Sequence, residues 1–172
     1  MTSTQTKAAH LTMPTPNGRF TLIHRDDGTV LASGWTDDPD YLMALIHPAL
    51  RADGLKKSTG EQRKRLRAAV QAYYDGEPAV LGGVAVAQSG GPFLEQAWQV
   101  MRSIGPGDTR TYTEVAELAG NGQAVRAAGA ACSRNAAVLF VPCHRILNAR
   151  GKIGGFRYGV ERKRWLLDHE AR

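Results

Sequence analysis

One short segment constrains this chain more than any other. Four apolar residues, 138–141, run into Pro142 and are followed by Cys143, His144 and Arg145, with two more apolar residues after them. An apolar run of this length indicates a buried segment. Proline lacks an N–H and fixes its own φ, so Pro142 ends any regular pairing there. The sequence therefore predicts a cysteine beside an imidazole and a guanidinium where a buried element stops.

Such a position suits a nucleophilic thiol. A nearby positive charge lowers a thiol pKa from about 8.5, so we expect Cys143 to be a thiolate. His144 can take the thiol proton directly or through one water. Neighbouring side chains in a strand point to opposite faces, so this cooperation requires a bend, which Pro142 favours. The alternative is a structural thiol, because buried cysteines often serve only as small hydrophobes.

Composition places the chain among ordinary globular proteins of one domain or two small ones. Hydrophobic residues make up 42% of the 172 and charged residues 22%. No apolar stretch approaches the roughly 20 residues that span a bilayer, so we expect no membrane partner. Residues 1–10 are expected to be a disordered lead-in without a secretory signal. With only Cys132 and Cys143 present, free thiols in the cytoplasm are the simplest expectation.

Positive charge is concentrated in the C-terminal part. The chain has a net charge of +6, and residues 101–172 alone carry a surplus of +6. An anionic partner, with nucleic acid as the leading candidate, fits this distribution. The alternative is that the charge only aids solubility.

Periodicity and turn signals divide the chain at the Ser-Gly-Gly-Pro run, 89–92. Before it, the pattern predicts strands and turns over 11–35, with a hairpin turn at 26–28. It also predicts a helix over 39–50, a helix ending at Tyr74 with a capping box of Ser58 and Glu61, and a strand over 80–87. The basic face of the second helix, 63–67, is expected to be solvated.

After the boundary, helical patterns cover 93–101, 113–119, 123–133 and 160–170. Thr111 or Thr113 can cap the second of these, whose Val115 and Leu118 should face inward. The turn Gly120-Asn121-Gly122 makes it and the next helix a helix-turn-helix pattern. That next helix consists mostly of alanine and glycine, with Arg126 its one long residue in the middle. It suits either tight core packing or close approach to a minor groove about 6 Å wide.

A glycine-rich loop, 151–159, carries Phe156 and Tyr158. It has neither the spacing nor the strand–helix context of a phosphate-binding loop. A flexible lid over a flat apolar ligand fits better.

Together these features resemble the O6-alkylguanine-DNA alkyltransferases, also called methylated-DNA–protein-cysteine methyltransferases. The match spans about 92–170 and rests on Gly107–Tyr112, the alanine-rich helix, Arg134-Asn135, Pro142-Cys143-His144-Arg145 and Trp165–Glu170. The resemblance implies a mixed α/β (α+β) fold. A ribonuclease-H-like α/β domain, 1–88, would precede a mostly helical domain, 89–172, with a winged-helix-like helix-turn-helix that binds DNA and accepts the alkyl group.

The implied reaction is direct transfer of the alkyl group from O6-alkylguanine, and also O4-alkylthymine, in double-stranded DNA to Cys143. His144, through a water, and Glu170 would form the proton relay. Asn135 would brace the turn, and Tyr112 would help to protonate the departing base. The base would flip from the minor-groove side, and Arg126 would fill the gap. No cofactor or metal is implied, and we expect a monomer, with cooperative DNA binding left open.

Two sets of binding residues follow from the same resemblance. The DNA-binding set is Thr111, Arg126, Ala127, Ala128, Gly129 and Ala131. The base-pocket set is Val141, Pro142, Gly155, Phe156, Arg157 and Tyr158.

The chemistry agrees with this assignment. A saturated carbon requires a soft, strong nucleophile, and the purine leaves more readily when it is protonated. The target lies inside the duplex, so the base must rotate out at a cost of a few kcal/mol. No residue set would remove a thioether product, so each molecule should act once.

The chain also departs from the family's usual pattern. Phe156 stands where a tyrosine is frequent, which leaves stacking without the hydroxyl. Arg157 and Tyr158 differ from the pairs found in several branches, which bears on the alkyl groups tolerated. Arg134-Asn135-Ala136 stands where glycine-asparagine-proline is frequent, which bears on the rigidity of that loop.

Other functions remain open at this point. A damage sensor that flips the lesion without transfer usually has another residue at the cysteine position. A helix-turn-helix transcription factor would need more base-reading side chains. A thiol hydrolase would also use cysteine and histidine. A zinc site of Cys143, His144 and His169 is a minor alternative.

Overall fold

The computed structural model describes residues 7–172. A four-stranded sheet in the order β3-β2-β1-β4 forms the first part of the chain. Its strands are β1 (Lys7–Thr15), β2 (Gly18–Arg25), β3 (Val30–Gly34) and β4 (Gly54–Lys57). The first three are antiparallel, whereas β4 runs parallel to β1. Within the expected disordered lead-in, residues 7–10 belong to β1, which corrects that expectation, and residues 1–6 lie outside the described residues.

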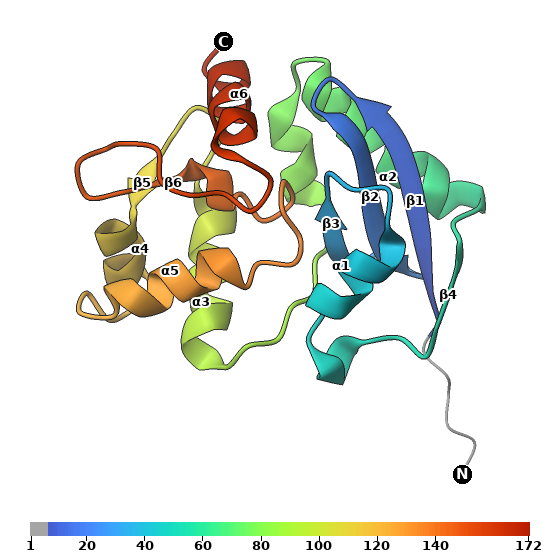
Figure 1. The fold of residues 1–172 in the computed structure, drawn as a ribbon, viewed down its shortest axis with the longest axis horizontal. Helices are drawn as coiled ribbons and strands as arrows, with labels where there is room; N and C mark the ends of the chain where they lie inside the picture. The colour runs from blue at the N-terminus through green and yellow to red at the C-terminus, as the bar shows by residue number, and fades with distance from the viewer. Residues whose placement is uncertain (1–6) are drawn as a thin grey trace.

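Helices cover both faces of this sheet (Figure 1). In β1 and β2, the alternating Leu11, Met13, Phe20 and Leu22 are buried on the same side as α2 (Gly60–Tyr74). On the opposite face, α1 (Pro39–Leu45) packs through Leu42. The helix predicted over 39–50 is broken at 46–47, and a 3-10 turn, η1 (Pro48–Leu50), follows. The residue before a proline disfavours the helical conformation, which explains the break before Pro48.

Two predictions for this half are wrong. The capping box is absent, because Thr59 precedes α2 without a side-chain cap bond and the Ser58 hydroxyl lies 2.7 Å from His24 Nε2. The strand predicted over 80–87 is mainly a 3-10 helix, η2 (Pro78–Gly83), with Val86 forming a bridge to Val30. A short apolar run does not distinguish a strand from a buried turn, and the proline at the start favours the helical conformation.

The second part of the chain is mostly helical. Its elements are α3 (Pro92–Ser103), β5 (Arg110–Thr111), α4 (Tyr112–Leu118), α5 (Val125–Ser133), η3 (Cys143–Arg145), β6 (Ile146–Leu147) and α6 (Val160–Glu170). The Thr111 side chain caps α4 in a capping box with Glu114, which confirms one of the two predicted caps. Leu118, expected to face inward, is 58% exposed. In Figure 1, α4 and α5 lie on the side away from the sheet. The predicted mixed α/β class is confirmed.

The two parts share a core and buried hydrogen bonds. Strand β3 meets the segment before Cys143, where Ser33 N donates to Ala136 O at 2.8 Å. The Ser33 hydroxyl donates to Val138 O at 2.6 Å. One apolar cluster extends from Leu11 through Cys143 to Leu166. None of the helices within residues 7–172 is long and apolar enough to cross a membrane.

Replacing Ser33 with alanine tests this junction. The substitution leaves the buried Val138 carbonyl without its hydroxyl donor, so the free energy of unfolding should fall by about 1–3 kcal/mol. Urea unfolding measures the change. Ser103→Ala is the matched control, because that exposed hydroxyl bonds within its own helix and its loss should change stability by no more than about 0.5 kcal/mol. Equal losses in the two variants would contradict the proposed importance of the junction.

Candidate active site

The segment before Cys143 is a tight buried turn. Val138 forms a bridge with Val141, and Val141 N donates to Ala137 O at 2.9 Å. Between them Leu139 has a φ of 77°, in the left-handed region. This conformation costs a residue with a side chain about 1–3 kcal/mol. The expected bend is therefore present, and Cys143 follows it as the first residue of η3.

Asn135 braces this turn from its centre. Its Nδ2 donates to Val141 O at 2.8 Å, and its Oδ1 accepts from Ala137 N at 3.1 Å. The same oxygen accepts from Gln88 Nε2 at 3.0 Å. Asn135 is fully buried, so these bonds satisfy both ends of its amide and hold the left-handed turn in place. Gln88, which lies at the end of the predicted N-terminal domain, is a bracing residue that the sequence did not reveal.

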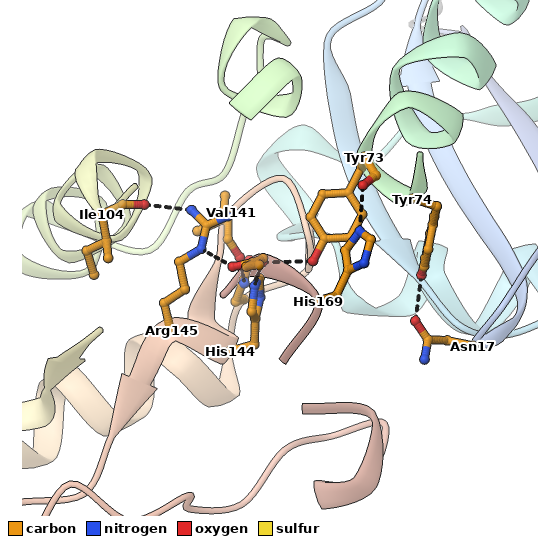
Figure 2. Close-up of polar contacts among 10 residues, drawn as sticks. Asn17, Tyr73, Tyr74, Ile104, Val141, His144, Arg145 and His169 are labelled. Carbon is orange, nitrogen blue, oxygen red and sulfur yellow. Dashed lines mark hydrogen bonds and ion pairs between the residues drawn. The ribbon is translucent and has the colours of Figure 1, made fainter. Parts of the chain in front are cut away.

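A buried carboxylate network connects His144 and Arg145, the two residues after Cys143, with Tyr73 (Figure 2). Glu170 Oε2 lies 2.7 Å from His144 Nε2, and Glu170 Oε1 accepts from Arg145 Nε at 2.7 Å. The Tyr73 hydroxyl donates to Oε2 at 2.8 Å, and Arg145 Nη1 donates to Ile104 O at 2.6 Å. Burial by itself raises the pKa of Glu170, but the hydrogen bonds and charges of His144 and Arg145 outweigh it and bring the pKa to about 2. Glu170 is thus ionised.

The ionised carboxylate fixes the state of His144. Burial lowers the pKa of His144 more than Glu170 raises it, so the imidazole is neutral at neutral pH. Because an ionised carboxylate only accepts hydrogen bonds, Nε2 carries the proton. The lone pair is then on Nδ1, which is buried and has no hydrogen-bond partner among residues 7–172. The structure thus brings His144 and Glu170 together and leaves one imidazole nitrogen free to accept a proton.

Cys143 is not a thiolate at rest, which corrects the expectation drawn from its neighbours. Burial raises the pKa of the Cys143 thiol above its ordinary value, against the opposing effects of Asn135, Lys163 and Arg157. The guanidinium of Arg145, which suggested a lowered pKa, is instead paired with Glu170. Proton removal must therefore be part of any reaction at this sulfur.

Lys163 is a further residue that the sequence analysis did not identify. Its side chain is 1% exposed, and its Nζ donates to Ile146 O at 2.7 Å. Burial lowers the pKa of Lys163, while the two cysteines raise it. Helical spacing was the available signal, because 163 lies three residues before Leu166 and seven before Glu170, on the same buried face.

A cavity of about 300 Å³ opens at Cys143. Its walls include Tyr112, Cys132 and, from the predicted base pocket, Gly155, Phe156 and Arg157. The volume is at the lower end of the range for small-molecule sites. Burial raises the pKa of Tyr112 to about 12, so its hydroxyl remains a neutral donor.

The other predicted pocket residues lie outside this cavity. Val141 and Pro142 are buried beside the turn, and Val141 lines a different hollow with Trp98 and Arg102. Tyr158 packs edge-on against Trp35, with ring centroids 5.4 Å apart. They support the site without lining it.

Two consecutive residues of the glycine-rich loop, Arg157 and Tyr158, contact other elements of the fold. Arg157 donates to the carbonyls of Ser133 and Asn135, at the end of α5. Tyr158 occupies a notch at Gly34, where an added Cβ would lie 1.9 Å from its hydroxyl oxygen. The predicted lid is therefore fastened to α5 on one side and to the sheet on the other.

Five of the six residues in the predicted DNA-binding set lie on α5, and they differ in their exposure to solvent. Arg126 is exposed, and Ala127 and Gly129 are partly exposed. Ala128 and Ala131 are fully buried, which corrects their assignment to a DNA-facing surface. Their small size lets α5 pack closely against α3, where Trp98 Nε1 donates to Ala131 O at 2.8 Å. The sixth member of the set, Thr111, has its hydroxyl engaged in capping α4.

The zinc alternative has no geometric support. His169 Nε2 lies 2.8 Å from the backbone oxygen of Tyr73. Across the described part of the chain, no three His, Cys, Asp or Glu side chains are grouped so that they could hold a metal ion.

Comparisons with known proteins identify relatives of this chain. A family model described as "6-O-methylguanine DNA methyltransferase, DNA binding domain" matches residues 92–172. A methylated-DNA–protein-cysteine methyltransferase of Shigella flexneri is 30% identical over 157 residues, which cover 91% of this chain and 92% of the relative. The corresponding protein of Salmonella typhimurium is 31% identical with the same coverage.

Solved structures extend the similarity to the fold. Mycobacterium tuberculosis O6-methylguanine methyltransferase has a TM-score of 0.76 and 27% identity, with 95% of this chain and 93% of that one covered. The Mycobacterium tuberculosis OGT structure in complex with DNA gives a TM-score of 0.75 at 25% identity, covering 96% and 92% of the two chains. Named relatives are at least 30% identical to this chain over about nine tenths of its length. This chain therefore belongs to the methylated-DNA–protein-cysteine methyltransferase family.

Proposed function

We propose that this protein repairs DNA by moving the alkyl group of O6-alkylguanine to Sγ of Cys143, once per molecule. The observation that carries the proposal is a buried thiol in the wall of a cavity, backed by a neutral imidazole and an ionised carboxylate. The named relatives with the same activity support it. O4-alkylthymine is a proposed second substrate, because it presents the same kind of alkyl–oxygen bond.

Transfer begins with removal of the thiol proton, because Cys143 is protonated at rest. Nδ1 of His144 takes this proton, directly or through one water, and the Glu170 carboxylate stabilises the resulting imidazolium. Sγ then attacks the alkyl carbon while the carbon–oxygen bond breaks, and the electron pair passes to the purine. The Tyr112 hydroxyl donates a proton to the departing guanine and is reprotonated, through water, by the proton that the His144 imidazolium gives up, so both side chains end neutral. The products are S-alkylcysteine and unmodified guanine in DNA.

Access to the cavity requires the guanine to leave the helix. The cavity accepts a flat group between Tyr112 and the loop at Gly155 and Phe156, and Phe156 offers a stacking face without a hydroxyl. Arg126, exposed near the start of α5, enters the gap from the minor-groove side, with Ala127 and Gly129 close to the backbone. Few side chains here can read base edges, so sequence preference is slight. The partner is double-stranded DNA, and the protein acts as a monomer.

We also infer the finer fold assignments. The strand order β3-β2-β1-β4, with β4 parallel to β1, supports a ribonuclease-H-like domain over 1–88. The pair α4–α5, next to the small β5–β6 sheet, supports a winged-helix-like domain over 89–172. Two free thiols, Cys132 and Cys143, suit a reducing compartment such as the cytoplasm.

Intact mass spectrometry tests the reaction. After incubation with duplex DNA containing O6-methylguanine, the protein should gain the mass of one methyl group, and peptide mapping should place it on Cys143. Cys143→Ser should gain nothing yet still bind the duplex. Cys132→Ser, which changes the other thiol of the same cavity, should still be methylated once. An unmodified wild-type protein that binds the lesion would identify a damage sensor instead.

Arg126→Ala tests the flipping step. Without a side chain to fill the gap, the single-turnover rate on duplex DNA should fall about tenfold, equivalent to about 1.4 kcal/mol. The rate on a single strand carrying the same lesion should change little, because no base pair has to be broken. Arg63→Ala on the exposed face of α2 is the control with the same loss of charge. Equal effects of Arg126→Ala on duplex and single strand would contradict the role of Arg126.

A further inference from the structure

We propose that the Tyr73 hydroxyl is a positioning group for alkyl transfer, which acts through Glu170 to set the proton affinity of His144. The inference rests on the proposed function, since it concerns the base that deprotonates Cys143. It gives the N-terminal part of the chain an indirect role in the chemistry, because Tyr73 lies on α2.

The argument starts from one oxygen atom with two donors. Glu170 Oε2 accepts from the Tyr73 hydroxyl at 2.8 Å and is 2.7 Å from His144 Nε2. Two donors on one carboxylate oxygen share its negative charge, so each hydrogen bond weakens the other. The strength of the tyrosine bond therefore determines how much charge remains to stabilise a protonated His144.

Tyr73 is held where it can only donate. Its side chain is fully buried, and burial, followed by the charge of Glu170, raises the pKa of its hydroxyl far above the ordinary value. Its backbone oxygen lies 2.8 Å from Nε2 of His169, the residue before Glu170. Tyr73 thus contacts α6 at two consecutive residues, which Figure 2 shows for the labelled tyrosine and His169.

The other groups around this network have fixed charge or other partners. Arg145, always protonated, is bound to Glu170 Oε1 and to Ile104 O. Lys163 lowers the pKa of His144, and its ammonium is bonded to Ile146 O. Tyr74 and His169 lie against the Tyr73 ring, with centroids 5.2 and 5.3 Å away. The remaining titratable neighbour is Cys143, the proton donor itself.

The sign of the effect follows. Without the tyrosine donor, Glu170 attracts the imidazole proton more strongly, so the pKa of His144 rises. A larger fraction of His144 is then already protonated at a given acidic pH and cannot accept the thiol proton. The acid limb of the rate profile should therefore move to higher pH.

The test measures single-turnover methyl transfer from saturating O6-methylguanine duplex across a range of pH values on both sides of neutrality. Tyr73→Phe removes one oxygen and keeps the ring and the backbone contact to His169. Its acid limb should move up by about one pH unit, so that the rate on that limb falls about tenfold. Tyr74→Phe is the matched control. It removes the neighbouring hydroxyl on the same helix, which is bonded to Asn17 and Trp35, and its acid limb should coincide with that of the wild type.

A second variant keeps the hydroxyl, so it tests the proposal even if Tyr73→Phe folds poorly. A fluorinated tyrosine placed at position 73 alone is a stronger donor, so its acid limb should move in the opposite direction, to lower pH. A merely structural role would change the rate by the same factor at every pH. If the wild type transfers the methyl group normally and the acid limb of every folded variant at position 73 coincides with that of the wild type, the role of Tyr73 is overturned and the proposed function stands. Absence of transfer by the wild type would overturn the proposed function and this inference together.

Discussion

The candidate active site is organised around one buried negative charge, the carboxylate of Glu170. Removing such a charge from water costs several kcal/mol unless partners compensate for it. Here Arg145, His144 and Tyr73 supply donors from two different parts of the chain. The same bonds that stabilise the charge also join α2, η3 and α6. Because these elements are far apart in the sequence, the network forms only when α2, η3 and α6 have packed together.

Much of the site was predictable because its residues lie in short motifs. Cys143 and His144 are adjacent in the sequence, and the resemblance to a known family added Asn135, Glu170 and Tyr112. The helical pattern of the C-terminal half was also correct in number and order, apart from the orientation of Leu118. Those elements have apolar residues at helical spacing and clear turn signals between them, which is where sequence patterns are most informative.

The remaining features depend on contacts between distant residues. Tyr73 and Gln88 bond to site residues 97 and 47 positions away, and no local pattern signals such a pairing. The protonation state of Cys143 was mispredicted because it depends on the balance between burial and charge, which only the folded chain defines. Ala128 and Ala131 were misassigned because small residues suit a packed helix face as well as an exposed one. The apolar run at 80–87 was ambiguous for a similar reason, since short apolar segments suit strands and buried turns alike.

The notch at Gly34 has a consequence for how this family can diversify. Tyr158 fits only because position 34 has no side chain, although the two residues lie in different halves of the molecule. Their identities should therefore covary among relatives: a larger residue at 34 requires a smaller one at 158. Phe156 and Arg157, which line the cavity, directly precede Tyr158. A substitution at position 34 would thus act on the segment that lines the cavity, although no residue of β3 lines it.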